Sequence, residues 1–200
     1  MQVDFYYGLG SRYSYLAATQ IEDLERGFGA RVAWHPLTSG ALMDLRRQNP
    51  FRGEPASGQY DWAYRQRDAE DWAALYGVPF IEPVGRLTFD RDLPALACLA
   101  AKRLGEVAAY SHAMFRMMFA EPRDGLTRDD ALAAAEEIGL ARVAFSEMLD
   151  RDDLRAEHDR ELATARERGA FGVPTFFVAE RMFWGNDRLP LVRAVLEGRI

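Results

Sequence analysis

The pattern of apolar and polar positions in the first 40 residues changes from strand-like to helical and back to strand-like. Residues 3–7 (VDFYY) form a run of β-forming side chains that ends at Gly8 and Gly10. Apolar side chains then recur every three or four residues over 13–28, which is the spacing of one helix face. Residues 31–37 (RVAWHPL) are again β-forming. This β-α-β order predicts two parallel strands joined by a right-handed crossover.

The middle of the chain is helical in pattern. Helical spacing occurs in the segments 60–77, 93–105, 106–121, 127–139 and 141–150. Thr127 and Asp130 form a capping-box variant at the start of one of these helices. Strand-like character is confined to 78–84 (VPFIEPV), and the polar Pro- and Gly-containing loop at 47–60 predicts a functional flap.

The last part of the chain returns to a β pattern. Residues 174–184 (PTFFVAERMFW) predict a hairpin with its turn at 179–180. A final helix follows, with Asn186 or Asp187 as its expected N-cap. The Val173–Pro174 peptide bond is a candidate for the cis isomer, which would leave the Val173 backbone able to pair with a ligand.

Composition and charge narrow the possible partners. Of the chain's 200 residues 48% are hydrophobic, so we expect a sizeable core. The net charge is −6 and there is no basic stripe, so we expect no nucleic-acid partner. Lys102 is the single exception among 25 basic residues, the others being arginine, whose planar guanidinium suits carboxylates. We find no signal peptide and no apolar run long enough for a membrane helix, and we expect a cytoplasmic protein.

Cys98 is the only cysteine, which excludes an internal disulfide and a thiol–thiol redox motif. It lies in an apolar helical segment and is expected to be a buried, inert thiol. The three histidines, His35, His112 and His158, lack the spacing of a metal site and are expected to be ordinary strand or helix residues.

The sequence GLGSRYS, residues 8–14, places two serines where the first strand gives way to the first helix. A dinucleotide site would need a third glycine in place of Tyr13 and an acid in place of His35. A serine hydrolase would need the pattern G-x-S-x-G, which is absent. Taken alone, the bend requires no more of Ser11 than that it cap the helix.

The rest of the chain adds a further interpretation. A strand-to-helix bend, a Pro-led hairpin and an inserted helical block together resemble a thioredoxin-like fold, whose bend usually carries C-x-x-C where this chain has S-R-Y-S. More specifically, the chain resembles the DsbA-like family of 2-hydroxychromene-2-carboxylate isomerases and kappa-class glutathione transferases. The matching segments are SRYSYLA at 11–17, against the family pattern S-P-Y-S-[YW]-L, DWAALYGVPF at 71–80, GVPTFFV at 172–178 and FWGNDRL at 183–189.

The resemblance implies an α/β fold class, with a thioredoxin-like domain over 1–39 and 169–200 and a large inserted all-helical domain over 40–168. It further implies glutathione as the cofactor, a small-molecule aromatic acid as the substrate, and a homodimer. We expect no bound metal, no nucleic-acid partner and no membrane association.

Within this family Ser11 has a physical role. A thiol with a pKa of about 8.5 is only slightly ionised at neutral pH. A helix N-terminus stabilises an adjacent anion by roughly 1–2 kcal/mol, and a charge-assisted hydrogen bond contributes roughly 1.5–3 kcal/mol. Ser11 is therefore expected to be catalytic, as a hydrogen-bond donor to the sulfur of bound glutathione.

The resemblance assigns the other glutathione contacts to the second half of the chain. Val173 and Pro174 are expected to present main chain to the glutathione backbone. Asn186 and Asp187 are expected to hold the γ-glutamyl end, since a carboxylate can pair with the ligand's ammonium. For both of these residues, helix capping is the alternative role.

The middle of the chain departs from the family pattern of a lysine, a G-N-x-P-P loop and a later K-x-x-Y. The expected substrate-binding residues are Arg47 or Arg52 in place of the lysine, Asn49 as the nearest loop asparagine, and Tyr64. Solvated arginines are the alternative for the first two. Arg12 stands where the family has proline, a change that could alter access to the thiolate.

The resemblance implies a glutathione-dependent isomerase of the 2-hydroxychromene-2-carboxylate isomerase type, acting on a ring-opened chromene or benzylidenepyruvate-like acid in aromatic catabolism. Two alternatives stay open. One is a kappa-class-like glutathione transferase, which would consume glutathione. The other is a non-catalytic DsbA-like protein that binds glutathione or a peptide.

Overall fold

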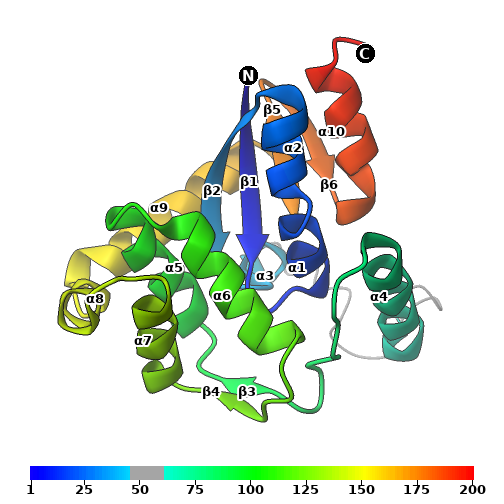
Figure 1. Cartoon of the computed structure of the whole chain (residues 1–200). Helices are drawn as coiled ribbons and strands as arrows, with labels where there is room; N and C mark the ends of the chain where they lie inside the picture. Colours follow the sequence, from blue (N-terminus) through cyan, green and yellow to red (C-terminus); the bar gives the residue numbers. More distant parts are fainter. Residues whose placement is uncertain (46–60) are drawn as a thin grey trace.

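The computed structural model describes residues 1–45 and 61–200 of the chain. A four-stranded sheet in the order β2-β1-β5-β6 lies at its centre (Figure 1). The strands are β1 (Gln2–Gly8), β2 (Arg31–Leu37), β5 (Thr175–Val178) and β6 (Arg181–Trp184). β1 and β2 are parallel, whereas β5 is antiparallel to both β1 and β6. A β-α-β unit and a β-hairpin thus share one sheet, which confirms the thioredoxin-like arrangement.

The first helical segment is two helices, not the single one that its spacing predicted. α1 (Arg12–Ala18) ends at Thr19, whose hydroxyl donates a hydrogen bond to the Leu16 carbonyl at 2.7 Å. α2 (Ile21–Phe28) then begins after Gln20. The three-and-four spacing continues across the break because both helices bury their apolar faces against the same core.

The central strand β1 owes its position to an alternation of side chains. Phe5 and Tyr7 face one side of the sheet, where the Phe5 ring stacks on Phe176 at 4.9 Å and meets Trp34 edge-on at 5.1 Å. Tyr6 faces the other side and belongs to a second, smaller apolar cluster. Since successive strand residues point to opposite faces, this run of aromatics requires cover on both.

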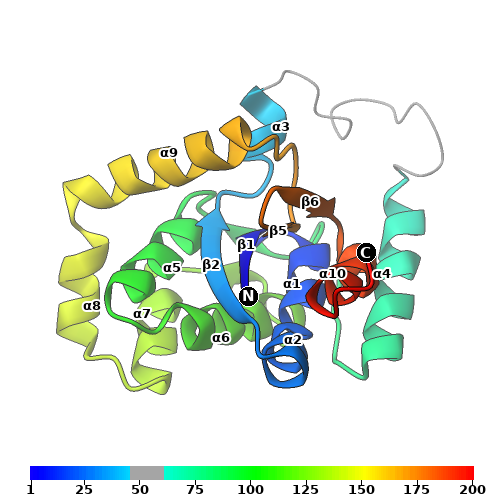
Figure 2. The ribbon, with the colours of Figure 1, turned by 90° about the horizontal axis from the view of Figure 1, so that it is seen from above.

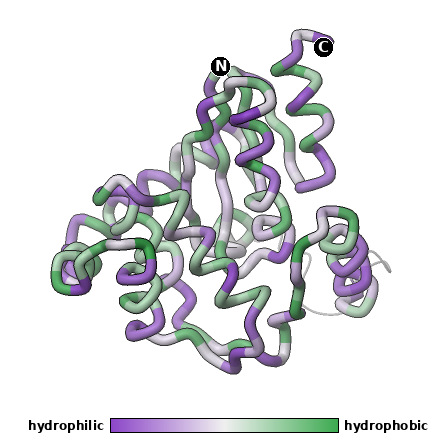
Figure 3. Tube along the Cα trace, viewed as in Figure 1, coloured by the Kyte–Doolittle hydropathy of each residue, from purple (hydrophilic) through white to green (hydrophobic). Residues whose placement is uncertain are grey.

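Helices from the middle of the chain provide much of that cover. They are α3 (Ala41–Leu45), α4 (Trp62–Tyr76), α5 (Leu93–Arg103), α6 (Val107–Phe119), α7 (Arg128–Glu137), α8 (Arg142–Leu149) and α9 (Asp152–Glu167). α9 crosses one face of the sheet, whereas α1, α2 and α6 lie over the other together with α10 (Leu189–Leu196) (Figure 2). Hydrophobic and hydrophilic segments alternate along these helices, as one-sided burial requires (Figure 3).

Three details of the inserted segment differ from the prediction. Residues 78–84 are irregular and not a strand. A two-residue parallel ladder joins β3 (Thr88–Phe89) to β4 (Gly125–Leu126), so the segment is not purely helical. α9 was not predicted, because it is rich in charge and buries only a few of its side chains. The capping box at Thr127 and Asp130 is confirmed.

The larger apolar cluster runs without a break from the sheet into the inserted helices, where Phe115 and Phe119 continue the aromatic packing. The division into a domain over 1–39 and 169–200 and another over 40–168 stays a prediction. Among the described helices, none is both long and apolar enough to cross a membrane.

Charged side chains attach α9 to the sheet. Glu161 accepts hydrogen bonds from His35 Nδ1 at 2.7 Å and from Lys102 Nζ at 2.6 Å. Burial alone would raise the pKa of Glu161, but these two hydrogen bonds lower it to about 2. Arg168 just after α9 reaches Asp4 of β1 at 2.6 Å. The single lysine of the chain therefore stabilises a carboxylate beneath the sheet.

The end of β2 is held by a second polar cluster. The backbone N–H of Thr38 donates to His158 Nε2 at 3.1 Å, and the Thr38 hydroxyl donates to Asp92 Oδ1 at 2.9 Å. Asp92 also pairs with Arg155 at 3.0 Å. Burial lowers the pKa of His158, so the ring is neutral and able to accept the Thr38 proton.

We expect the free energy of unfolding to depend on His158 in mildly acidic solution. An unfolded histidine titrates near pH 6.5, and its pKa is lowered in the fold, so this contribution is full above about pH 6.5 and is lost as the pH falls toward the folded pKa. In His158→Gln the amide oxygen can still accept from Thr38 without titrating. The free energy of unfolding, measured with urea between about pH 5 and 7, should therefore depend less steeply on pH in this variant than in the parent. The difference in slope should be at most about 1.4 kcal/mol per pH unit.

His112, at an exposed position of α6, retains its own pH dependence in this variant, because partial desolvation of its ring lowers its pKa as well. If the unfolding free energy had the same pH dependence in the parent and in His158→Gln, His158 would not be the acceptor of the Thr38 proton.

Candidate active site

Three segments distant in sequence meet at the ends of β1 and β2. They are the bend between β1 and α1, the residues that follow β2, and the segment before β5. A Cβ atom on Gly8 would lie 2.5 Å from Ser39 Oγ and 3.2 Å from Val173 Cγ2. The backbone N–H of Gly10 donates to Ser39 Oγ at 2.9 Å. Only glycine at position 8 permits this approach without displacing its neighbours.

Ser11 begins α1 as expected, with extended backbone angles (φ −101°, ψ 116°). Its Oγ accepts the Ser14 backbone N–H at 3.2 Å, and no described residue accepts its hydroxyl proton. Ser14 is fully buried, and its own Oγ accepts the Gly8 N–H at 3.3 Å. Because Ser11 is only partly buried, it is the serine of this bend that a ligand can reach. α1 is only seven residues long, so the hydroxyl matters more here than the helix dipole.

The Val173–Pro174 peptide bond is cis, as predicted. Val173 lies just outside β5, and within the described residues neither its backbone N–H nor its C=O is hydrogen-bonded. Val173 is partly exposed as a residue, and a backbone with an unused donor and acceptor can pair with an extended peptide, as an added strand does.

Asn186 and Asp187 follow β6 in a short 3-10 helix (Asn186–Arg188). The prediction that either caps the last helix is wrong, since α10 begins only after Arg188 and has no side-chain cap. Asn186 is buried, and its Nδ2 has no hydrogen-bond partner in the described structure. The Asp187 side chain is 46% exposed and lies 3.6 Å from Arg188. The turn therefore presents the Asp187 carboxylate to a ligand, and an unpaired amide donor lies buried beside it.

The expected substrate-binding residues are placed only in part. Arg47, Asn49 and Arg52 lie outside the described residues. Tyr64 lies in the first turn of α4 and is 48% exposed. Its role in substrate binding stays a prediction.

Arg12 forms a buried ion pair. Its Nη2 lies 2.8 Å from Glu82 Oε1, and the two side chains are only 5% and 12% exposed. The guanidinium also lies over the Trp62 ring, 5.3 Å from its centre. The ion pair joins the start of α1 to the loop after α4.

Residues that the sequence patterns did not indicate also surround the bend. Ser39 is the closest of them. Phe89 Cζ lies 3.4 Å from where a Cβ on Gly10 would be, and Arg91 Nη2 lies 3.7 Å from the corresponding position on Gly40. No short motif links these positions, because the inserted helices and β3 bring them together.

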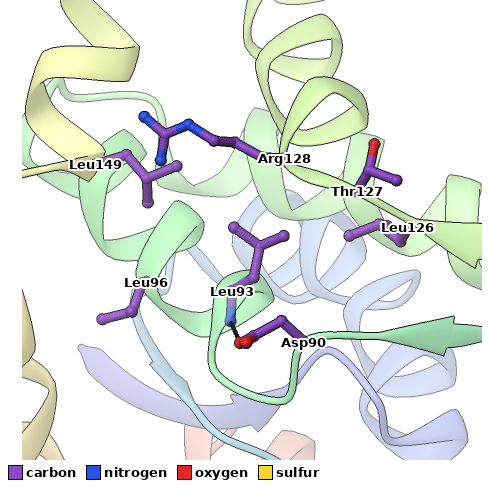
Figure 4. Close-up of a pocket in the computed structure, with 7 residues that line it drawn as sticks. All are labelled: Asp90, Leu93, Leu96, Leu126, Thr127, Arg128 and Leu149. Atoms are coloured by element: carbon purple, nitrogen blue, oxygen red, sulfur yellow. Dashed lines mark hydrogen bonds between the residues drawn. The ribbon is translucent and has the colours of Figure 1, made fainter.

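One cavity in the described structure lies away from Ser11, at the N-terminal end of α5 (Figure 4). It has a volume of about 430 Å³ and is lined by Asp90, Leu93, Leu96, Leu126, Thr127, Arg128 and Leu149. Its charged groups are occupied, because Asp90 accepts the N–H of Leu93 at 3.0 Å and Arg128 pairs with Asp150 at 2.7 Å. We therefore place the chemistry at the bend and not in this cavity.

Cys98 is fully buried, which confirms the prediction for its position. Burial raises the pKa of its thiol to about 12, so it stays protonated at neutral pH. Over residues 1–45 and 61–200, no group of three or more His, Cys, Asp or Glu side chains could hold a metal ion.

The fold and the bend thus define a thioredoxin-like protein that has serines where thiol redox proteins have cysteines. The model of the DSBA-like thioredoxin domain matches residues 2–197, and the chain belongs to this family.

Individual proteins and solved structures similar to this chain are more specific than the family. The chain is 29% identical over 207 residues to a 2-hydroxychromene-2-carboxylate isomerase of Pseudomonas putida, covering 100% of this chain and 96% of the relative. A solved 2-hydroxychromene-2-carboxylate isomerase superposes with a TM-score of 0.82 at 26% identity, covering 100% of this chain and 95% of that one. The cytosolic disulfide reductase DsbM from Pseudomonas aeruginosa, in its structure with GSH, shares the fold at a TM-score of 0.69 and 22% identity over 100% and 98% of the chains.

We expect the Arg12–Glu82 pair to stabilise the fold only while both partners are present. Arg12→Met leaves the Glu82 carboxylate buried and unpaired, which should lower the free energy of unfolding by about 3–5 kcal/mol. Adding Glu82→Gln should recover much of this loss, so that the two substitutions are far from additive in urea unfolding.

The exposed pair of Arg26 and Glu22 on α2 is the matched control, and its Arg26→Met variant should change stability by less than about 1 kcal/mol. Additive losses at Arg12 and Glu82 would contradict a coupled ion pair.

Proposed function

We propose that this protein is a glutathione-dependent isomerase of the 2-hydroxychromene-2-carboxylate isomerase type, acting on a small aromatic acid in aromatic catabolism. The observation that carries the proposal is the Ser11 hydroxyl, whose proton has no acceptor among the described residues. It lies at the end of β1 in a chain that matches isomerases of this name over its full length. We extend the proposal to a cytoplasmic homodimer, as the family resemblance implies.

Glutathione fits the groups around the bend. Its peptide backbone can pair with the unused N–H and C=O of Val173. Its γ-glutamyl end carries a carboxylate and an ammonium, which suit the unpartnered Asn186 Nδ2 and the Asp187 carboxylate. In solved DsbM the bound GSH belongs to a protein of the same fold.

When bound, glutathione would supply a thiolate that adds to an unsaturated carbon of the ring-opened substrate and leaves again after bond rotation. Ser11 donates a hydrogen bond to the sulfur and so favours its anionic form. The Ser14 N–H holds Ser11 Oγ as an acceptor, which leaves the hydroxyl proton for this role. Ser11 needs no neighbouring base, because it gives a hydrogen bond and does not attack.

A kappa-class-like transferase and a non-catalytic glutathione- or peptide-binding protein are the alternatives. With an aromatic pyruvate as substrate, an isomerase leaves total thiol constant, a transferase depletes it, and a binder produces no spectral change. A thiol assay alongside the spectroscopic assay therefore separates the three. A thermal-shift titration in which saturating glutathione adds no stability would contradict the isomerase, the transferase and the glutathione binder and leave only the peptide binder, since about 100 times the Kd should add roughly 2.7 kcal/mol.

Ser11→Ala should lower kcat by about 100-fold while largely keeping glutathione affinity, because one charge-assisted hydrogen bond to the sulfur is lost. The ultraviolet absorbance of the bound thiolate should fall as well. Ser11→Thr retains a hydroxyl and should keep most of the activity. Steady-state kinetics and a pH titration of the thiolate absorbance measure both effects.

Ser14→Ala is the matched control, since Ser14 is buried beneath the same bend. It should cost stability and leave the thiolate absorbance of the folded protein in place. An active Ser11→Ala beside an inactive, folded Ser14→Ala would overturn the assignment of the donor.

Asp187→Asn should weaken glutathione binding by roughly 10- to 150-fold, because it removes the charge that pairs with the γ-glutamyl ammonium. The melting temperature of the free protein should change little, since Asp187 caps no helix and is half-exposed. Isothermal titration calorimetry measures the affinity.

A glutathione analogue that lacks the ammonium serves as the control ligand. The parent and Asp187→Asn should bind it about equally. Equal weakening of both ligands would show that Asp187 does not contact the ammonium.

A further inference from the structure

Ser39 has a hydroxyl group that the proposed glutathione contacts do not use. Its Oγ accepts the Gly10 N–H at 2.9 Å, and no described residue accepts its proton. The side chain is only partly buried, and it approaches Gly8 of the bend, as Val173 does. Ser39 therefore places a second hydroxyl donor beside the backbone of Gly10, the residue that precedes Ser11.

Two further groups face the same glycines from the inserted segment. Phe89 is partly buried and would touch a Cβ on Gly10, whereas the Arg91 guanidinium lies over Gly40, the residue after Ser39. An aromatic ring, a hydroxyl donor and a guanidinium therefore border the bend on the side of β2.

The two aspartates that flank Arg91 in the sequence, Asp90 and Asp92, hold the backbone of this segment in place. Asp90 accepts the backbone N–H of Asp92 at 2.9 Å and of Leu93 at 3.0 Å. Asp92 accepts the Thr38 hydroxyl and pairs with Arg155. These bonds also hold the backbone on both sides of the cluster, since Thr38 precedes Ser39 and Asp92 follows Arg91.

We propose that Ser39 and Arg91 bind the carboxylate of the second substrate, with Phe89 against its aromatic part. The inference rests on the proposed function, because it places the acid beside the sulfur that Ser11 is proposed to hold. Guanidinium and hydroxyl donors match a carboxylate, and an aromatic edge suits a flat ring. Arg91 thus has the role that the sequence pattern suggested for Arg47 or Arg52.

The test measures equilibrium binding, so that it does not depend on turnover. The probes are benzylidenepyruvate and its uncharged methyl ester, titrated by quenching of tryptophan fluorescence with and without S-methylglutathione, which has no free thiol. Arg91→Gln should weaken binding of the acid by roughly 10- to 100-fold and leave the ester unchanged. Ser39→Ala should weaken the acid by a smaller factor, and Arg91→Lys should fall between parent and Arg91→Gln.

Arg26→Gln, on the exposed face of α2, is the matched control for a lost positive charge and should bind like the parent. In every variant the affinity for S-methylglutathione should stay within about twofold of the parent. Kinetics on the acid should show the loss in KM and little change in kcat.

Each outcome separates this inference from the proposed function. Equal binding of the acid by the parent and Arg91→Gln, or equal affinity of the parent for acid and ester, overturns the carboxylate site while glutathione binding stands. If the parent does not bind S-methylglutathione, the proposed function is overturned. The carboxylate site is then decided by titrating the acid in the absence of S-methylglutathione. A parent that binds neither probe overturns the carboxylate site.

Discussion

The close approach of the β1–α1 bend to the end of β2 is the constraint on which the site depends. Gly8 and Gly10 let Ser39 come within contact of the backbone, and the Gly10 N–H then bonds to the Ser39 hydroxyl. A side chain at Gly8 would collide with Ser39 and press on Val173. Two glycines in one bend therefore allow three segments to converge, and every group proposed to act in catalysis lies at or beside this convergence.

The inserted helices hold this convergence in place and do more than cover the sheet. Thr38, at the end of β2, is bonded to His158 of α9 and to Asp92 before α5. Glu161 of α9 is bonded to His35 of β2 and to Lys102 of α5. Polar contacts of this kind are directional, so they determine where β2 ends relative to the bend more closely than apolar packing alone would. The same inserted segment also supplies Phe89, from β3, and Arg91, from the turn before α5.

Much of the fold follows from local patterns. The β-forming run of β1, the glycines of the bend, the Pro-led hairpin and the Thr127–Asp130 capping box each have a local physical cause, and each is present in the structure. The failures also have causes. α9 buries only a few of its positions, so no apolar period indicated it, and Thr19 ends α1 without interrupting the apolar spacing. Asn186 and Asp187 resemble a helix cap in sequence, yet a 3-10 turn intervenes before α10.

The sequence by itself determined the four strands of the central sheet, the position of Ser11 at a helix start, the burial of Cys98 and the resemblance to a thiol-binding family. These depend on residues close together in the chain or on motifs that keep their spacing. Only the tertiary structure decided that Ser39, Phe89 and Arg91 border the bend and that Arg12 is paired with Glu82. Contacts of this kind join positions separated by whole helices, and their geometry depends on how those helices pack, which no local pattern of side chains encodes.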